Sequence, residues 1–512
     1  MSTSSRPRTP WWYPTGRKLT ALFLVLALIG GVSWWVWSTT YCASGIRRLG
    51  PECVGVTDGG FVFTPDLASA LEQIQDENRW VAQQVDRPSV SIAYLVPLPR
   101  EADNLSEILR HELQGASIAQ HRANRTNELG DLPLIRLLVA NTGEGGNHWQ
   151  PVVAQLLDRV GSSDRLVAVA GLGESRETTR QAIAELSAHE IPMIAARPAA
   201  DDLGGEGFVR MAPISRDQAA VAIAYLKQLD PPVSRALLIQ DVNPEDPYTR
   251  TLGDAFIRGF PDATHALIEP VERYDGSLGG LANRFVQMMA NICQQRPDVV
   301  YFAGRGNHLE AFIEALPGRP CPDLRVNLMT GGTGARAAIV LRQQIERGQT
   351  PLQAGLGANV TFRYTTQAHP GAWAVAPASF SQASIRYFQQ NCPDPACFAS
   401  LYRGESLDDS GAVIGHDAVV TAVRAIRSAA GDRDLVTDPI TTDEVIQQFN
   451  GLHDSFAVPG ASGWISLDGD GNPVNKAIPI LQLLPDGTVM FVQLSSLLPP
   501  PFTPLNPQDP GT

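Results

Sequence analysis

The sequence predicts an α/β protein with two Rossmann-like lobes that follow an N-terminal transmembrane helix. Short apolar strands alternate with amphipathic helices along most of the chain, a pattern that favours parallel sheets covered by helices on both faces. The chain has 512 residues, of which 44% are hydrophobic, enough for two lobes that each enclose a core. One long uncharged apolar run lies near the N-terminus.

The apolar run at residues 19–38 predicts a single membrane-spanning helix. Residues 19–37 contain no charged side chain and are long enough to cross a bilayer. Basic residues precede the run and no acidic residue appears before Glu52, so we expect residues 1–18 in the cytoplasm and the main body outside. A cleaved signal peptide is the competing interpretation, although no clean small-x-small site follows the run. Lipidation of Cys42 is a weaker alternative, because no small residue directly precedes it.

Net charge argues against a nucleic-acid partner, and cysteine usage agrees with an exported protein. The chain has 40 basic and 53 acidic residues and a net charge of −13, which opposes binding to nucleic acid. Its six cysteines form three pairs that are close in sequence, and no pair has the spacing of a zinc or redox site. Other connectivities are possible, but local pairing needs the least rearrangement. We therefore predict three structural disulfides: Cys42 with Cys53, Cys293 with Cys321, and Cys392 with Cys397.

The exported part divides into a segment beside the membrane, residues 39–88, and two lobes. The first lobe, 89–212, has predicted strands at 89–96, 134–140, 166–171 and 191–196, with helices between them at 104–122, 149–160 and 174–188. The second lobe, 213–362, has predicted helices at 215–229, 248–260, 278–295 and 307–316, and strands at 236–240, 266–269, 299–303 and 325–329.

The rest of the chain returns to these lobes. Residues 363–455 are expected to rejoin the first lobe, with helices at 380–390, 410–429 and 442–449. Residues 456–495 are expected to form a terminal hairpin on the second lobe. Residues 496–512 are rich in proline, which predicts an extended tail.

The most informative local pattern is the strand-to-helix turn at residues 171–179. Small residues and hydroxyls at such a turn leave backbone N–H and side-chain O–H groups facing one point, at the positive end of a helix dipole. This geometry predicts a pocket for a small polar ligand. Because two parallel sheets would each present the carboxyl ends of their strands, the pocket is expected in a cleft between the lobes.

Motifs for cofactors, metals and catalysis are incomplete. The turn resembles a dinucleotide fingerprint, but Arg176 stands where a glycine is needed. Residues 330–334 have no lysine for a phosphate, and residues 468–472 imitate a calcium loop in which Pro473 replaces the required glycine. No nucleophile elbow and no histidine pair with metal spacing is present. We therefore predict that the protein has no cofactor, no metal and no catalytic residue, and that it is not an enzyme.

Four segments in order resemble a known family. They are Glu-Leu-Gln-Gly-Ala-Ser-Ile-Ala at 112–119, Leu-Leu-Val-Ala-Asn-Thr at 137–142, Ala-Gly-Leu-Gly-Glu-Ser at 170–175, and Ile-Pro-Met-Ile-Ala at 191–195. Together they resemble the type 1 periplasmic-binding-protein fold over about residues 89–492. The branched-chain amino-acid-binding proteins of ABC transporters are the nearest branch.

The resemblance implies a set of ligand-binding residues. Ser175 matches a serine that helps hold the ligand carboxylate, with Thr178 one turn later. Tyr248 matches a position where aromatic residues line the cleft. The loop that carries Arg197 and Ala199 matches a loop that offers small and hydroxyl residues.

Three positions depart from the family pattern. Arg197 stands where a small residue is usual, Arg305 where an aromatic residue is expected, and Gly332 where an acid would neutralise an α-ammonium group. A zwitterionic amino acid is therefore poorly served, and the two arginines favour an anionic ligand, since guanidinium groups bind carboxylates bidentately. The alternative is that both arginines point outward as ordinary surface charges.

The predicted function is that of a membrane-anchored extracytoplasmic solute-binding protein of bacterial ABC-transporter type. Its lobes would close on an amino-acid-like or anionic solute, and a permease or another membrane protein would read the closed shape. The alternative is a sensory or scaffolding ectodomain that regulates a partner membrane protein. An enzyme is a distant third interpretation.

Overall fold

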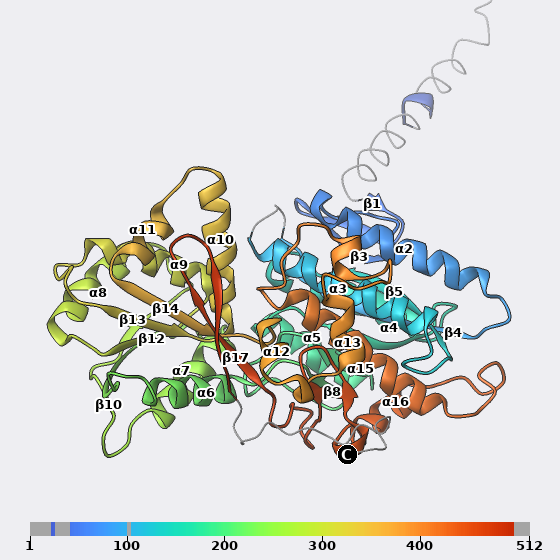
Figure 1. The fold of residues 1–512 in the computed structure, drawn as a ribbon. Helices are drawn as coiled ribbons and strands as arrows, with labels where there is room; N and C mark the ends of the chain where they lie inside the picture. The colour runs from blue at the N-terminus through green and yellow to red at the C-terminus, as the bar shows by residue number, and fades with distance from the viewer. Residues whose placement is uncertain (1–21, 26–40, 100–103, 496–512) are drawn as a thin grey trace, which may run out of the picture.

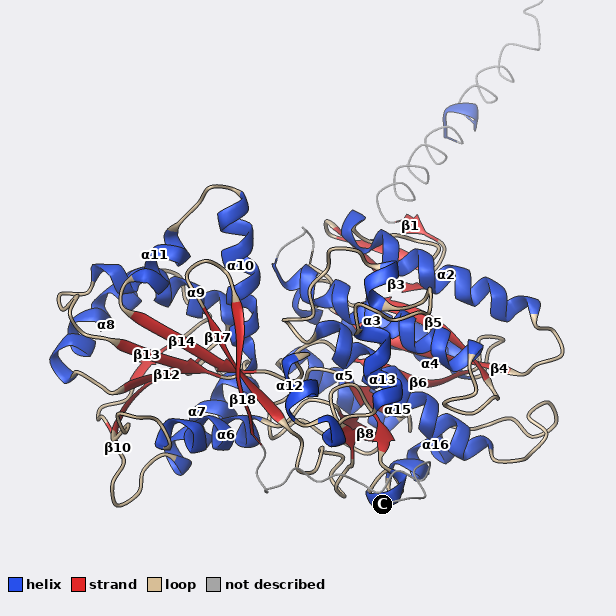
Figure 2. Cartoon of the chain, viewed as in Figure 1, coloured by secondary structure: helices blue, strands red, loops and turns tan. Residues whose placement is uncertain are grey.

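Two α/β lobes lie side by side in the structure, a computed structural model that describes residues 22–25, 41–99 and 104–495. Each lobe is a sheet with helices on both faces (Figures 1 and 2). The predicted cytoplasmic segment 1–18 and the proline-rich tail 496–512 lie outside the described residues, as does the predicted membrane span 19–38 except for residues 22–25, which are helical. Within the described part of the chain, no helix combines the length and the apolar character that a bilayer crossing requires.

The first sheet has eight strands in the order β1-β2-β3-β5-β4-β6-β7-β8. Strands β4 to β8 are parallel to their neighbours, and β1 to β3 add antiparallel strands at one edge. The segment 39–88, which was expected beside the membrane, thus contributes three strands to the first sheet. The strand bounds are β1 Tyr41–Ala43, β2 Ile46–Leu49, β3 Glu52–Thr57, β4 Ser89–Val96, β5 Leu134–Asn141, β6 Leu166–Gly171, β7 Met193–Ala195 and β8 Phe208–Arg210.

Six helices cover this sheet. Apolar side chains of α2, α3, α15 and α16 pack on one face, and those of α4 and α5 pack on the other. The backbones of helices α3 and α15 are in contact, and the contact requires glycine on both helices. A Cβ on Gly115 would lie 1.8 Å from the Ala412 carbonyl oxygen, and a Cβ on Gly415 would lie 2.2 Å from the Glu112 carbonyl oxygen. The bounds are α2 Ala68–Gln83, α3 Asn104–Arg125, α4 Trp149–Val160, α5 Glu177–Ala188, α15 Gly411–Ala430 and α16 Thr442–Phe449.

The second sheet has the order β10-β9-β12-β13-β14-β17-β18, with β11 also paired to β9. The strands up to β14 are parallel, and the hairpin β17–β18 closes the far edge antiparallel to β14. The bounds are β9 Arg235–Asp241, β10 Ala266–Leu267, β11 Glu272–Tyr274, β12 Val299–Ala303, β13 Val326–Thr330, β14 Val360–Thr365, β17 Ile478–Leu483 and β18 Val489–Ser495.

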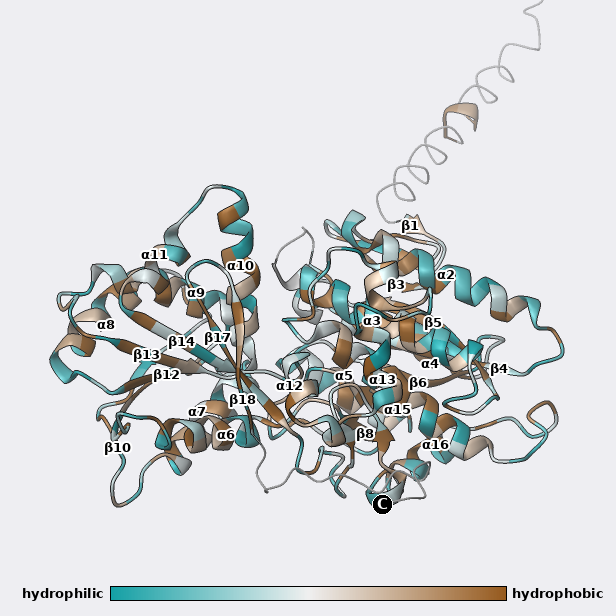
Figure 3. Cartoon of the chain, in the orientation of Figure 1, coloured by the Kyte–Doolittle hydropathy of each residue, from teal (hydrophilic) through white to brown (hydrophobic). Residues whose placement is uncertain are grey.

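Helices again cover both faces of the second sheet. Helices α6 and α7 pack on one face, and α8 to α11 pack on the other. Apolar residues concentrate on the inner strands of both lobes (Figure 3). The bounds are α6 Ser215–Lys227, α7 Pro247–Gly259, α8 Leu281–Gln295, α9 Gly306–Ala315, α10 Ala335–Glu346 and α11 Pro351–Gly357.

Three chain segments run between the lobes, after β8, after β14 and before β17. Beside them lie the short elements α12 Gly371–Val375, α13 Gln382–Ile385, α14 Phe398–Leu401, β15 Val458–Pro459 and β16 Trp464–Ile465. The helix expected at 380–390 is therefore shorter, and ends in a 3-10 turn at Arg386–Phe388.

The expectation that 456–495 lies wholly on the second lobe is wrong for its first part. Val458, Ile465 and Leu467 are buried in the core of the first lobe, and only the β17–β18 hairpin joins the second sheet. These apolar side chains belong to the same buried cluster as those of α15.

The cysteine prediction is confirmed. Disulfides join Cys42 to Cys53, Cys293 to Cys321 and Cys392 to Cys397. The first ties β1 to β3, and the second joins the end of α8 to the loop before β13.

Candidate functional site

A cleft of ≈ 420 Å³ opens between the lobes. The loops that follow parallel strands supply its walls: the β6–α5 loop from the first lobe, and the β9–α7 and β12–α9 loops from the second. A narrow inner part of ≈ 30 Å³ continues from it, and Glu174, Arg197 and Arg305 line both parts. A cleft at the carboxyl ends of strands is where ligands bind in open α/β folds.

All six residues predicted to bind ligand lie at this cleft. Thr178 lines the outer part, Ser175, Ala199 and Tyr248 line the inner part, and Arg197 and Arg305 line both. They come from separate loops and from both lobes, so the fold brings together what the sequence separates by up to 130 residues.

The two predicted hydroxyls are used within the first lobe. Ser175 Oγ accepts hydrogen bonds from the backbone N–H groups of Ala199 and Ala200 at 2.8 and 3.0 Å. Thr178 donates to the Gly145 carbonyl oxygen at 2.7 Å. Both side chains therefore fix the shape of the loops that wall the cleft.

Ala199 and Tyr248 are also engaged. The Ala199 carbonyl oxygen accepts from the backbone N–H and the hydroxyl of Ser215 at 2.7 and 3.0 Å, which ties it to the first residue of α6. Tyr248 is buried on α7, and its hydroxyl donates to Gln218 at 3.4 Å. Burial raises the pKa of Tyr248 to about 12, so this phenol stays protonated.

Arg305 crosses from the second lobe to the first. Its Nε and Nη2 donate to the two carboxylate oxygens of Asp246, the Nη2–Oδ1 distance being 2.9 Å. The same Nη2 donates to the Ser175 carbonyl oxygen, and Nη1 lies 3.4 Å from Glu174 Oε2. Burial lowers the pKa of Arg305, but Asp246 and Glu174 outweigh it and raise the pKa above its usual value.

Arg197 is held more loosely. Its Nη2 donates to Glu174 at a long 3.4 Å, while Nη1 lies 3.6 Å from Glu112 Oε1 and makes no hydrogen bond. The side chains of Arg197 and Arg305 are only 14% and 10% exposed. The alternative that both arginines point outward is therefore wrong.

Three carboxylates at these arginines were missed from the sequence. Glu112 is fully buried on α3 and accepts from the Tyr94 hydroxyl at 2.9 Å; burial raises its pKa to about 7, with Arg197 opposing. Burial also acts to raise the pKa of Glu174, but Arg305 and three further arginines lower it to about 2. Asp246 caps α7 by accepting from the Thr249 N–H at 3.2 Å. An aspartate before a proline at a helix start was the available signal for this residue.

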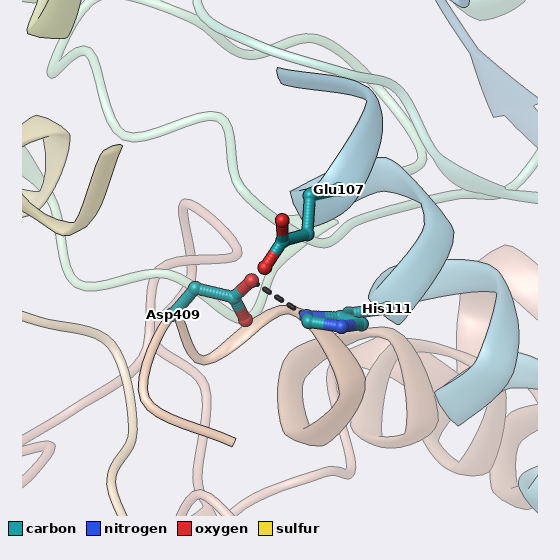
Figure 4. Close-up of side chains that lie close together, drawn as sticks. All are labelled: Glu107, His111 and Asp409. Carbon is teal, nitrogen blue, oxygen red and sulfur yellow. Dashed lines mark hydrogen bonds and ion pairs between the residues drawn. The ribbon is translucent and has the colours of Figure 1, made fainter. Parts of the chain in front are cut away.

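A second polar group lies where α3 meets the loop before α15. Glu107, His111 and Asp409 bring their ligand-type atoms within 4.8 Å of one another (Figure 4). His111 Nδ1 lies 2.6 Å from Asp409 and Nε2 lies 3.0 Å from Glu405. Burial lowers the pKa of His111, but Asp409 and Glu405 outweigh it and raise it to about 9. Both ring nitrogens thus donate to carboxylates, which fits an imidazolium rather than a metal ligand.

The lobes are tied together by further contacts of the chain itself. Arg342 on α10 donates to Glu107 on α3, Arg250 on α7 lies 2.5 Å from Asp202, and the Glu177 N–H donates to the Glu245 carbonyl oxygen at 3.2 Å. Together with Arg305, these contacts span the cleft from both sides.

No protein-family model matches the chain, and no curated protein matches it. Solved structures do. A leucine-binding protein from Thermotoga maritima is 17% identical, with a TM-score of 0.56 over 79% of this chain and 98% of its own. A branched-chain amino-acid transporter substrate-binding protein from Streptococcus pneumoniae, in complex with isoleucine, is 15% identical, with a TM-score of 0.58 over 80% of this chain and 99% of its own.

A solute-binding protein of an ABC transporter from R. palustris, in complex with 4-hydroxybenzoate, is 13% identical, with a TM-score of 0.54 over 80% of this chain and 97% of its own. The chain therefore has the two-lobe fold of the type 1 periplasmic binding proteins. This confirms the two-lobe α/β part of the predicted fold class. At these sequence identities the likeness shows the fold alone.

Proposed function

We propose that this protein is a solute-binding protein of ABC-transporter type that captures a small polar solute between its lobes. The observation that carries the proposal is the cleft, because loops of both lobes supply its charged side chains. A volume of ≈ 420 Å³ suits a small metabolite. The structural neighbours that bind leucine, isoleucine and 4-hydroxybenzoate support the same role.

Capture would work by hinge closure about the three interlobe segments. A solute that touches both lobes stabilises the closed form by its differential affinity for that form. Arg197 on the first lobe is the side chain that we assign to solute contact. Ser175, Thr178 and Ala199 would hold the loops in shape, and Tyr248 and Arg305 would form the wall on the second lobe.

Residues 19–38 would anchor the protein in the membrane with the lobes outside, where a permease could read the closed form. This part of the proposal rests on the uncharged apolar run and on the basic residues before it. The three disulfides support an oxidising compartment. Intact mass of the membrane-extracted protein separates an uncleaved anchor from a cleaved signal.

A thermal-shift screen of the purified protein against small acids, amino acids and sugars tests solute capture. We expect at least one class to raise the melting temperature in a concentration-dependent way. Arg197→Gln is expected to remove that shift, whereas Arg284→Gln, an exposed arginine of the second lobe, is expected to keep it. A flat response of the wild type to every class would contradict the proposal.

One observation favours a second function, that of a sensory or scaffolding ectodomain. The chain's own ion pairs already tie the lobes together, so closure could proceed without a solute. In that case a partner membrane protein would be the ligand. Genes for a permease and an ATPase beside this one favour transport, and a regulator or kinase gene favours sensing.

A further inference from the structure

We propose that the cleft selects carboxylic acids that carry no amino group, because the buried guanidinium of Arg305 already engages the carboxylates of Asp246 and Glu174. This inference rests on the proposed solute-binding function and names its substrate class. It gives the two arginines different roles. Arg305 is a permanent cation of the cleft wall, and Arg197 is the hydrogen-bond donor that would bind the carboxylate of the solute.

The charged acceptors around Arg305 are already taken. Both carboxylate oxygens of Asp246 accept from Arg305, and the Ser175 carbonyl oxygen accepts from the same guanidinium. Glu174 is shared by Arg305, Arg197 and Arg176. An ammonium group would find neither Asp246 nor Glu174 free and would lie beside a buried positive charge, which is unfavourable at short range.

The other hydrogen-bond acceptors that line the cleft do not make a binding site for a cation either. Asp409 accepts from His111 and from the Gly411 N–H. Gln367 Oε1 is buried without a hydrogen-bond partner, but it is a neutral amide oxygen. Glu144, Glu177 and Glu245 line the outer cleft, where solvent makes an ion pair worth little.

The donor side, by contrast, has a buried guanidinium nitrogen that no acceptor uses. Arg197 Nη1 has no hydrogen-bond partner, and Arg197 lines both the outer cleft and its inner part. Its nearest acid besides Glu174 is Glu112, at 3.6 Å. A carboxylate that enters the cleft meets the guanidinium that lines it, and once the Arg197 side chain turns toward the solute, Nη1 can donate a charge-assisted hydrogen bond without losing an existing partner.

The test compares ligands that differ by one group. The full-length protein is titrated calorimetrically with 4-methylpentanoate, with leucine, which adds the ammonium, and with 3-methylbutylamine, which lacks the carboxylate. We expect 4-methylpentanoate to bind at least about tenfold more tightly than leucine, and the amine not to bind. The pair 3-phenylpropanoate and phenylalanine repeats the comparison on an aromatic skeleton.

Two variants assign the roles. Arg197→Gln should lower the affinity for the acid by about tenfold or more, because it removes the free donor. Arg305→Gln frees Asp246 and should reduce the preference for acid over amino acid by at least about tenfold. Arg296→Gln, an exposed pair with Asp323 on the second lobe, is the matched control and should change neither value.

The outcomes are distinguishable. Leucine binding as tightly as 4-methylpentanoate to the wild type would overturn the inference while leaving solute capture intact. Binding of no probe here, together with a flat thermal-shift screen, would overturn the proposed function and the inference with it. The wild-type comparison needs no variant, so it decides the question even if Arg305→Gln fails to fold.

Discussion

Glu112 Oε1 and Arg197 Nη1 lie 3.6 Å apart beside the cleft, and neither atom has a hydrogen-bond partner. Glu112 is fully buried on α3, and burial raises its pKa to about 7 despite the opposing effects of Arg197 and the Tyr94 hydroxyl. Glu174 and Asp409 also face it and favour its protonated form. Of the two carboxylates that face Arg197, Glu174 therefore stays ionised, whereas the charge of Glu112 changes near neutral pH.

We predict that carboxylate affinity falls as pH rises through 7. Protonated Glu112 leaves Arg197 free for the solute, whereas ionised Glu112 competes for the same guanidinium and repels an entering anion. Affinity for 4-methylpentanoate should be about tenfold tighter at pH 6 than at pH 8, measured by calorimetry. Glu112→Gln should remove the difference, and Glu185→Gln, a substitution of an exposed glutamate, should retain it. Equal wild-type affinities at the two pH values would contradict this assignment of Glu112.

Glu112 should also make the fold less stable as pH rises from about 4.5 to 7. Its folded pKa of about 7 exceeds the ordinary 4.5, so the folded state holds a proton that the unfolded state has released. The difference of about 2.5 units corresponds to about 3 kcal/mol of unfolding free energy lost across that window. Urea unfolding between pH 4.5 and 8 measures it. Glu112→Gln should flatten the profile in this window; an unchanged profile would exclude Glu112 as its source.

His111 should have its effect in a higher window. Its folded pKa of about 9 lies above the ordinary 6.5, so its stabilisation is complete below pH 6.5 and is lost as pH rises through 9. His111→Gln should lower the unfolding free energy at pH 6 by about 3 kcal/mol and have a much smaller effect at pH 9.5. His189→Gln, an exposed histidine near Glu185, is the control. A loss of equal size at both pH values would indicate packing rather than charge.

The sequence specified the central elements of the fold well. Strands β4, β6 and β12 have the predicted bounds, because each is a short, mostly apolar run. The edge strands β1 and β8 were missed, since three residues are too few for a period to appear. The helix expected at 380–390 was overestimated, because its apolar residues are buried by tertiary packing rather than by one helical face.

The sequence predicted where the site residues lie better than it predicted what their side chains bind. The strand-to-helix turn placed Ser175 at the cleft, and the two arginines were identified from their departures from the family pattern. The roles changed because their partners are distant in sequence: Asp246 is 59 residues from Arg305. No local pattern reports that a guanidinium saturates an aspartate across such a separation. Glu112 was inside a quoted segment, but its burial depends on the contact of α3 with α15.

The ion pairs that join the lobes should control the shape of the unliganded protein. Removing the cations in Arg305→Gln/Arg342→Gln eliminates the contacts with Ser175, Glu174 and Glu107. We expect the closed-to-open ratio to fall by at least about fivefold, seen as a larger radius of gyration in X-ray scattering. The double variant Arg284→Gln/Arg296→Gln removes two exposed arginines of the same lobe and should leave the scattering unchanged. Identical curves for the two double variants would indicate that packing alone holds the lobes closed.

Lys476 should be the most costly lysine to replace. It is buried in the segment before β17, where its ammonium donates to the Met211 carbonyl oxygen at 2.8 Å and to Ser462 Oγ at 2.7 Å. Ser462 in turn donates to the buried Asp417 at 2.6 Å, so the lysine joins two interlobe segments to α15. Burial lowers the pKa of Lys476 to about 8, with Asp417 opposing.

Lys476→Met should lower the unfolding free energy by about 3 to 5 kcal/mol, because it leaves Asp417 without its compensating charge in the interior. Lys227 gives the matched comparison: it pairs with Asp262 at 2.7 Å on the surface, and Lys227→Met should cost no more than about 1 kcal/mol. Urea unfolding of both variants at pH 7 measures the difference. If both substitutions lower the unfolding free energy by the same amount, the Lys476 network does not stabilise the interlobe segments. The contacts across the cleft would then be what holds the two lobes in their relative positions.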